Sequence, residues 1–180
     1  MSKKSSDRTL KIVIAAMFSA MIAVLTAFIK IPTPTGGYVH LGDTCVYLCA
    51  CFLPMPYSIL ACAIGGGIAD LLVYPETIIF TIIIKSLNSL FFSSKDEKIL
   101  TKRNKLMIIP SGLVTVLGYS ISKFIRDLLI GTDMLTALFD ALYKIPENFI
   151  QATASGLMFL LIAYAFDKAD IKQRMLRGRN

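Results

Sequence analysis

The residue of this chain whose chemistry most needs an explanation is Lys85, an ammonium group inside a long apolar segment. It lies about eight residues from the start of that segment at Thr77, or roughly 12 Å along a helix. A charge at that depth is strongly unfavourable unless it faces other polar groups or water. Asn88 and Ser89 follow at helical spacing and share its face. Such groups can bind a ring nitrogen, a hydroxyl or a carboxylate of a small molecule.

Further polar side chains are expected at the same level of other apolar segments. His40 and Asp43 open the second segment, and Asn148 and Gln151 form an amide pair in the first turns of the last one. A binding pocket needs a few well-placed polar groups among apolar walls. These residues therefore predict an outward-facing pocket for a small polar molecule, with Lys85 as its anchor.

The remaining charged residues near this level leave two alternatives open. Asp70, close to the outer end of the third segment, is a candidate counter-ion, which would make Lys85 part of a purely structural ion pair. Lys123 and Asp127 have the spacing of an i, i+4 pair. With Arg126 they are interpreted mainly as interfacial, and the alternative is that one of them reaches the pocket.

Catalytic chemistry lacks its usual residues. The chain has one histidine, which excludes a two-histidine metal site. The triple glycine Gly65–Gly67 is not followed by the Lys-Ser/Thr of a phosphate loop, and we interpret it as a place of close helix packing. The cysteines form no CxxC pair and are expected to be buried reduced thiols: Cys45, Cys49, Cys51 and Cys62. We therefore expect neither an enzyme nor a bound cofactor.

The positive charge of the chain predicts a membrane topology. Hydrophobic residues make up 55% of the 180 residues and charged residues 17%, against about 25% charged in a soluble domain. Lysine and arginine gather in three places, near residues 3–11, 95–105 and 168–179. Cytoplasmic ends of membrane helices are enriched in these residues. The net charge of +7 is thus explained by topology and anionic lipid, and nucleic acid is not expected as a partner.

Six apolar segments are long enough, or nearly so, to cross a bilayer. They are residues 11–29, 39–52, 57–73, 77–92, 106–130 and 146–166. The second segment is short. The first two basic clusters lie on the same side of the membrane only if an even number of crossings separates them, so this segment is expected to cross as well. Residues 134–144 are amphipathic and are expected in the outer interface. The fold class is therefore an all-α membrane protein, a bundle of six transmembrane helices with both termini inside.

The domain organisation follows from these segments. Residues 1–10 are expected to be a cytoplasmic tail, residues 11–166 the membrane domain and residues 167–180 a second cytoplasmic tail. Small residues recur along the first segment at Ala16, Ala20, Ala23 and Ala27. Such a stripe lets another helix approach closely, either inside the bundle or on a partner subunit.

Four stretches of this chain resemble, in order, the substrate-binding S components of energy-coupling factor (ECF) vitamin transporters. They are residues 28–43, 63–71, 82–87 and 145–151, within a similarity that covers roughly residues 15–165. The branch looks closest to S components for hydroxymethylpyrimidine or pyridoxine. Ser86 and Ser89 depart from the family, which often has glycine at these positions.

The resemblance implies a function in uptake. An S component binds a water-soluble vitamin from outside, docks on a membrane T subunit driven by two cytoplasmic ATPases, and topples in the bilayer to release it. It implies that the alanine stripe contacts the T subunit and that the first and third outer loops close over the ligand. The ligand-binding residues are then expected to be Lys85, Asn88, Asp43, His40, Tyr38, Asp70, Asn148 and Gln151. The expected location is the plasma membrane of a prokaryote, as a multi-pass protein.

Other functions remain as alternatives. The chain could be an S component for another small metabolite. It could also be an independent secondary transporter, although no repeat relates its two halves. A membrane enzyme or a scaffold is a further alternative, but a scaffold would not need Lys85 at depth.

Overall fold

The computed structural model describes residues 3–33 and 38–177, and it is almost entirely helical. The helices and strands are α1 (Lys3–Ala27), β1 (Lys30–Pro32), β2 (Tyr38–His40), α2 (Gly42–Phe52), α3 (Tyr57–Val73), η1 (Pro75–Thr77), α4 (Ile78–Phe91), α5 (Lys102–Leu106), α6 (Ile108–Leu129), α7 (Met134–Tyr143), α8 (Ile145–Lys168) and α9 (Ile171–Arg177).

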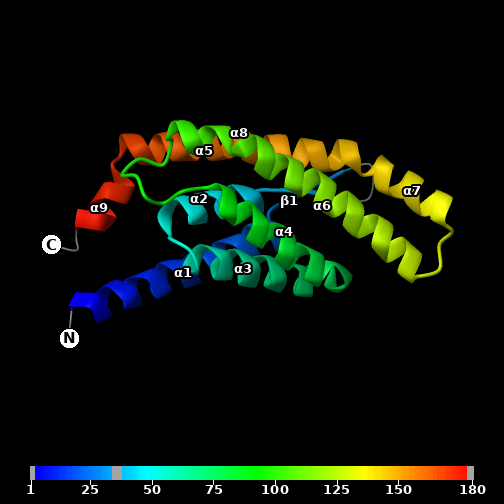
Figure 1. Cartoon of the computed structure of the whole chain (residues 1–180), viewed down its shortest axis with the longest axis horizontal. Coiled ribbons are helices and arrows are strands. Elements are labelled where there is room, and N and C mark those ends of the chain that lie inside the picture. Colours follow the sequence, from blue (N-terminus) through cyan, green and yellow to red (C-terminus); the bar gives the residue numbers. More distant parts are fainter. Residues whose placement is uncertain (1–2, 34–37, 178–180) are drawn as a thin grey trace.

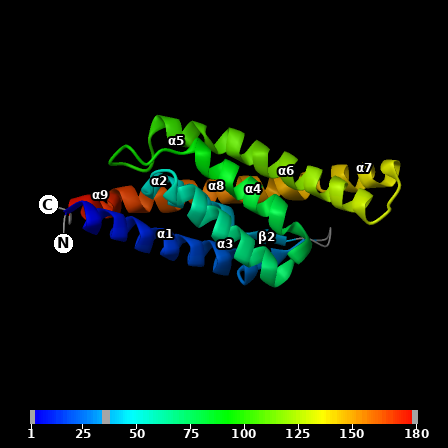
Figure 2. The same cartoon turned by 60° about the horizontal axis from the view of Figure 1, so that its bottom comes forward.

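The helices form an elongated bundle with two distinct ends (Figures 1 and 2). The start of α1, the loop before α5, and α9 lie at one end, which we call the basic end. The β1–β2 hairpin, η1 and the turn between α6 and α7 lie toward the other, the hairpin end. The chain runs between the two ends along α1, α2, α3, α4, α6 and α8 in turn. The described parts of the three basic stretches of the sequence therefore lie at the same end of the bundle.

Helix α2 is the centre of the bundle. Every residue from Gly42 to Cys51 is buried, and the helix contacts α1, α3, α4 and α8. Its 11 residues extend only about 16 Å, whereas a hydrocarbon core is about 30 Å thick. Because other helices surround α2, its short length does not expose its ends to lipid. The predicted segment 39–52 begins too early, since Val39 and His40 belong to β2.

The outer helices present apolar side chains to the surroundings. Met17, Leu72, Ile79, Leu113 and Leu161 are all more than half exposed, as expected where lipid replaces water as the solvent. Among the described residues, three helical stretches are long and apolar enough to cross a membrane: Asp7–Ala27, Lys102–Leu129 and Met134–Lys168. Helices α2 and α3 are shorter apolar helices. The chain is thus an all-α membrane protein, and six crossings with both termini inside remain a prediction.

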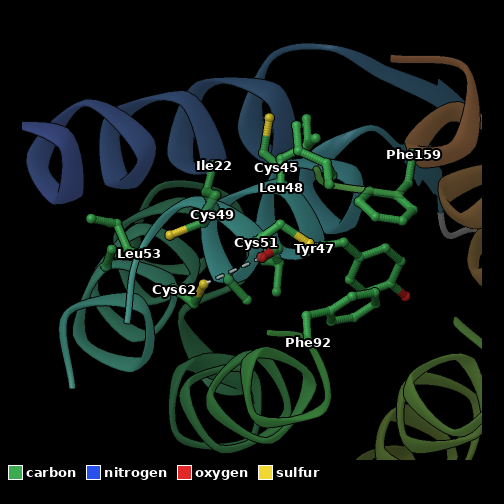
Figure 3. Close-up of a cluster of buried hydrophobic side chains, with 14 of the residues drawn as sticks. Ile22, Cys45, Tyr47, Leu48, Cys49, Cys51, Leu53, Cys62, Phe92 and Phe159 are labelled. Carbon is green, nitrogen blue, oxygen red and sulfur yellow. Dashed lines mark hydrogen bonds between the residues drawn. The ribbon is translucent and has the colours of Figure 1, made fainter. Parts of the chain in front are cut away.

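A buried apolar cluster lies around α2 (Figure 3). Its aromatic members are Tyr47, Phe92 and Phe159. The ring of Tyr47 stacks on Phe92 with a centroid distance of 4.7 Å, and Phe159 meets both rings edge-on at 5.8 and 5.4 Å. The four cysteines are buried and free, which confirms the prediction of buried reduced thiols.

The triple glycine permits close packing of α3, as the sequence predicts. A Cβ atom on Gly65 would lie 2.6 Å from the backbone oxygen of Ser19 in α1. One on Gly66 would lie 2.8 Å from Cγ of Lys85 in α4. Real Cβ atoms do not approach other atoms so closely, so larger residues at these positions would push α1 and α4 away from α3.

The loop before α5 is fixed to the C-terminal helices. The carboxylate of Asp167 accepts hydrogen bonds from the backbone N–H groups of Ile99 and Leu100 at 2.7 and 2.9 Å. Nζ of Lys172 donates to the backbone oxygens of Ser94 and Asp96 at 3.1 and 2.6 Å. Asp167 and Lys172, in the segment expected to be a tail, therefore take part in the fold. At the other terminus α1 begins at Lys3, within the expected tail of residues 1–10.

Candidate binding site

A cavity of about 370 Å³ opens at the hairpin end. It lies among β2, the ends of α3 and α6, η1 and the start of α8. Its lining residues are His40, Asp70, Tyr74, Glu76, Thr77, Tyr119, Ser122, Lys123, Arg126, Lys144, Glu147, Asn148 and Gln151. The volume is within the range of about 300–1,000 Å³ of small-molecule sites.

Gln151 joins the wall of the cavity to the groups beneath it. Its Oε1 accepts from the backbone N–H of His40 at 2.7 Å. Its Nε2 lies 2.9 Å from the backbone oxygen of His40, 3.0 Å from Oδ2 of Asp43 and 3.0 Å from Oγ of Ser155. The side chain therefore fixes the hairpin to α8 and positions the carboxylate of Asp43.

His40 is neutral in this setting. Its Nδ1 accepts a hydrogen bond from the backbone N–H of Gly42 at 3.0 Å, which requires that this nitrogen carries no proton. Burial, helped by the ammonium of Lys85, lowers the pKa of His40 from 6.5 to about 4, although the carboxylate of Asp43 acts in the opposite direction. The imidazole therefore contributes no charge to the cavity near neutral pH.

Below the cavity lies a layer of fully buried polar groups, Asp43, Lys85 and Asn88, which we call the buried polar layer. Nζ of Lys85 forms an ion pair with Oδ1 of Asp43, and neither side chain is exposed. Nδ2 of Asn88 donates to Oγ1 of Thr115 at 2.8 Å. Nζ of Lys85 also lies 5.8 Å from the ring centre of Tyr119, a cavity residue. The ammonium is thus paired as the membrane environment demands.

The counter-ion of Lys85 is Asp43 and not Asp70, which corrects one alternative from the sequence. Asp70 accepts instead from the hydroxyl of Thr77 at 2.6 Å. From the sequence, Asp43 and Asp70 are expected at a similar depth in the membrane. The difference arises because α2 is the central helix and contacts α4 through the face that carries Asp43.

The structure brings the predicted site residues together in two groups. His40, Asp70, Asn148 and Gln151 line the cavity. Lys85, Asn88 and Asp43 lie in the buried polar layer rather than in the cavity wall. The side chain of Tyr38 lies outside the described residues. Contact of any of them with a ligand stays a prediction.

Helix α6 supplies wall residues that the sequence predicted only in part: Lys123 and Arg126 entered as an alternative, and Tyr119 and Ser122 were not candidates. The cavity is lined by Tyr119, Ser122, Lys123 and Arg126. Both Lys123 and Arg126 therefore reach the cavity. Their spacing of three, four and seven residues marks one face of a helix. That polar stripe was visible in the sequence and could have indicated the wall.

Each cation in the wall has a carboxylate partner. Lys123 contacts Asp127 at 2.6 Å and Asp140 at 3.4 Å. Arg126 meets Glu76 at 3.3 Å, and Lys144 meets Glu147 at 2.9 Å. The wall therefore contains several charged groups, and their positive and negative charges balance.

The alanine stripe of α1 is divided by the fold. Ala16 and Ala20 are exposed, whereas Ala23 and Ala27 are buried against the rest of the chain. Only the first two are accessible to another protein. Whether they dock a partner stays a prediction.

The arrangement suits binding of a small molecule. Among the described residues, no group of three histidines, cysteines or carboxylates is placed to hold a metal ion. The cavity instead offers tyrosines, amides and paired charges that can orient a polar ring. Beneath it, the buried polar layer and then the aromatic rings of Tyr47, Phe92 and Phe159 occupy the interior.

Comparison with known proteins adds two findings. Residues 6–168 match the family described as "ECF-type riboflavin transporter, S component". A protein of Pyrococcus woesei, described as "Uncharacterized protein in gap 3'region", is 30% identical over 103 residues. That alignment covers 54% of this chain and 68% of the relative.

Proposed function

This chain belongs to the family of ECF-type riboflavin transporter S components, and on that premise we propose that it captures a water-soluble vitamin with a hydroxylated heteroaromatic ring. Membership makes the chain a substrate-binding membrane subunit of a transporter. The observation that carries the proposal for the ligand is the cavity of about 370 Å³ at the hairpin end, with its tyrosines, amides and paired charges.

Two kinds of ring are candidates for the ligand. Hydroxymethylpyrimidine and pyridoxine are small hydroxylated rings, and the four sequence stretches at residues 28–43, 63–71, 82–87 and 145–151 favour them. Riboflavin is the second candidate, because the matching family is described by that vitamin. A volume near the lower end of the usual range favours the smaller rings.

In the proposed site the two groups of polar residues have different tasks. His40, Asp70, Asn148 and Gln151 contact the ligand from the wall. Asn148 is supported there by hydrogen bonds of its Nδ2 to the backbone oxygen of Val116 at 3.4 Å and to Oγ of Ser120 at 3.1 Å. The buried polar layer holds Gln151 through Asp43 and attracts a ligand that reaches deeper.

Uptake requires partners that the S component lacks. We propose a membrane T subunit that docks near Ala16 and Ala20, and two cytoplasmic ATPase subunits. The proposed location is the prokaryotic plasma membrane, with six crossings and the basic end inside. A cysteine at Thr132 should react with a membrane-impermeant reagent from outside, and one at Lys98 should not. Outside labelling of position 98 would overturn this topology.

Native mass spectrometry of the purified chain, followed by calorimetry, tests the ligand. The first reads the mass of any retained molecule, and the second compares hydroxymethylpyrimidine, pyridoxine and riboflavin. Asn148→Ala should weaken binding about ten-fold through its lost hydrogen bonds. Thr153→Ala, on the exposed side of the same helix, is the matched control. If the chain retains no vitamin and binds none of the three, the proposed function is wrong.

A second measurement separates a transporter subunit from an independent secondary transporter. ATPase subunits should co-purify with the chain from its own membranes. Uptake in vesicles that contain this chain alone would favour the secondary transporter.

A further inference from the structure

Buried polar atoms without hydrogen-bond partners are uncommon in folded proteins and call for an explanation. In the part of the chain that the structure describes, six side chains carry such an atom. They are Thr26, Tyr47, Asn88, Ser111, Ser122 and Arg126. Of these, Ser122 and Arg126 line the cavity. The two unpartnered atoms are Oγ of Ser122 and Nε of Arg126.

These two residues belong to one face of α6. They are four residues apart, one helical turn, so their side chains are neighbours. Ser122 is only 1% exposed, and Nε of Arg126 is buried although its Nη1 reaches Glu76 at 3.3 Å. An unsatisfied buried donor is strongly unfavourable, the more so on a charged group. The cavity beside them is the space from which a partner can come.

Tyr119 completes this face one turn earlier. Its hydroxyl lies 3.3 Å from Oγ1 of Thr81, and Nζ of Lys85 lies 5.8 Å from its ring centre. Thr81 and Lys85, both residues of α4, therefore hold the ring of Tyr119 in place. An aromatic ring in a cavity wall favours a flat ring as ligand, since two rings pack well in offset or edge-to-face geometry.

The charges of the wall indicate the charge of the ligand. The wall contains three cations, Lys123, Arg126 and Lys144, and an equal number of carboxylates, Asp70, Glu76 and Glu147. Two of these cations pair with wall carboxylates, and Lys123 pairs with Asp127 and Asp140 outside the wall. An anionic ligand would have to compete with carboxylates that already contact the cations at 2.6 to 3.4 Å. An uncharged ligand leaves these ion pairs intact.

We propose that Tyr119, Ser122 and Arg126 form the ligand-recognition face of the cavity and select an uncharged flat ring, with an acceptor such as a carbonyl or a ring nitrogen for Nε of Arg126. The hydroxyl of Ser122 bonds a second polar atom on the same edge of the ring. The transported vitamin is therefore taken in its free form and not as its phosphate ester. This inference rests on the proposed function of the cavity.

Calorimetry on the full chain in detergent tests the recognition face. The probes are riboflavin, pyridoxine and hydroxymethylpyrimidine, each compared with its phosphate ester. For the probe that binds, Ser122→Ala should weaken affinity about three- to ten-fold, and Arg126→Lys, which keeps the charge facing Glu76, about ten-fold or more. The phosphate ester should bind at least about ten-fold more weakly than the free ring, since it disturbs the ion pairs.

Ser111→Ala is the matched control. Ser111 is on the same helix, fully buried and also unpartnered, but it does not line the cavity. This variant should leave affinity within about two-fold of wild type, as expected for a site without ligand contact. Without ligand, Ser122→Ala should unfold at a temperature no lower than wild type, because it removes an unsatisfied group. A purely structural role of Ser122 would instead lower that temperature.

The outcomes separate this inference from the proposed function. If a probe binds wild type, Ser122→Ala and Arg126→Lys equally well, water alone satisfies these atoms and the inference is wrong. A phosphate ester that binds more tightly than its free ring would contradict the proposal that the ligand is uncharged. If none of the probes binds wild type, the proposed function fails, and the inference fails with it.

Discussion

The ion pair between Lys85 and Asp43 should be a major determinant of stability. Both side chains are 0% exposed, so removal of one partner leaves a buried charge. Such a loss destabilises a protein by about 3–5 kcal/mol. Lys85→Met should be near the lower value, because Asp43 keeps its bond from Gln151 at 3.0 Å. Asp43→Asn should be near the upper value, since the ammonium then has only an amide oxygen and a ring nearby.

The double variant Lys85→Met/Asp43→Asn should recover most of this loss. It contains no buried charge at this position, so its free energy of unfolding should be within about 1 kcal/mol of wild type. For a chain of this size, 3 kcal/mol corresponds to a shift in melting temperature of about 6–12 °C. A thiol-reactive dye suits the measurement, because the four cysteines are buried and free in the folded state.

Two results would refute this reasoning. Single variants that melt within about 4 °C of wild type would mean that the pair contributes little. A double variant as unstable as the sum of the singles would mean that the two groups do not act as a pair. Ligand affinity gives a separate test of the proposal that Lys85 contacts the ligand. If Lys85 contacts the ligand, the double variant should bind it about ten-fold or more weakly than wild type, even though its stability is restored.

Three further predictions concern the rest of the chain. Because the pKa of His40 is lowered to about 4 in the folded state, the unfolded chain binds more protons between about pH 6.5 and 4, and stability should fall as pH falls through that window. His40→Asn should flatten this dependence in melting curves, and an unchanged slope would contradict the assignment. Gly65→Ala should destabilise by about 1–3 kcal/mol through overpacking. Gly112→Ala, whose Cβ would meet its nearest atom at 3.5 Å, should be tolerated in the same assay. Ala20→Leu should abolish uptake by the complete transporter while the isolated chain still binds ligand, and equal loss of both would assign Ala20 to the core.

Sequence patterns predicted the positions of helices along the chain better than the side-chain contacts between those helices. The bounds of α3 were predicted as residues 57–73, because Pro54, Pro56 and Pro75 delimit an unbroken apolar run. The depth of Lys85 was evident from hydropathy alone. Its partner was not, because spacing along one helix does not determine which face of another helix it meets.

Other features depend on tertiary contacts that a sequence does not display. The hairpin β1–β2 pairs Lys30 with His40, whereas the sequence predicts an apolar segment from Val39 onward and a connection rich in proline and glycine before it. The roles of Lys123 and Arg126 depend on the rotation of α6 about its axis. An i, i+4 pair on a helix surface and a cavity wall share the same spacing, so only the structure separates them.

The burial of α2 bears on how the protein is made. A segment of 11 residues with an aspartate in its first turn is a poor candidate for insertion into a bilayer by itself. Its carboxylate finds Lys85 and Gln151 only in α4 and α8, which leave the ribosome after it. The stable seating of α2 is therefore a late event in biogenesis. It waits for α4, whose Lys85 follows Asp43 by 42 residues, and for α8, whose Gln151 follows it by 108, so a chain arrested after α3 lacks both partners of its central carboxylate.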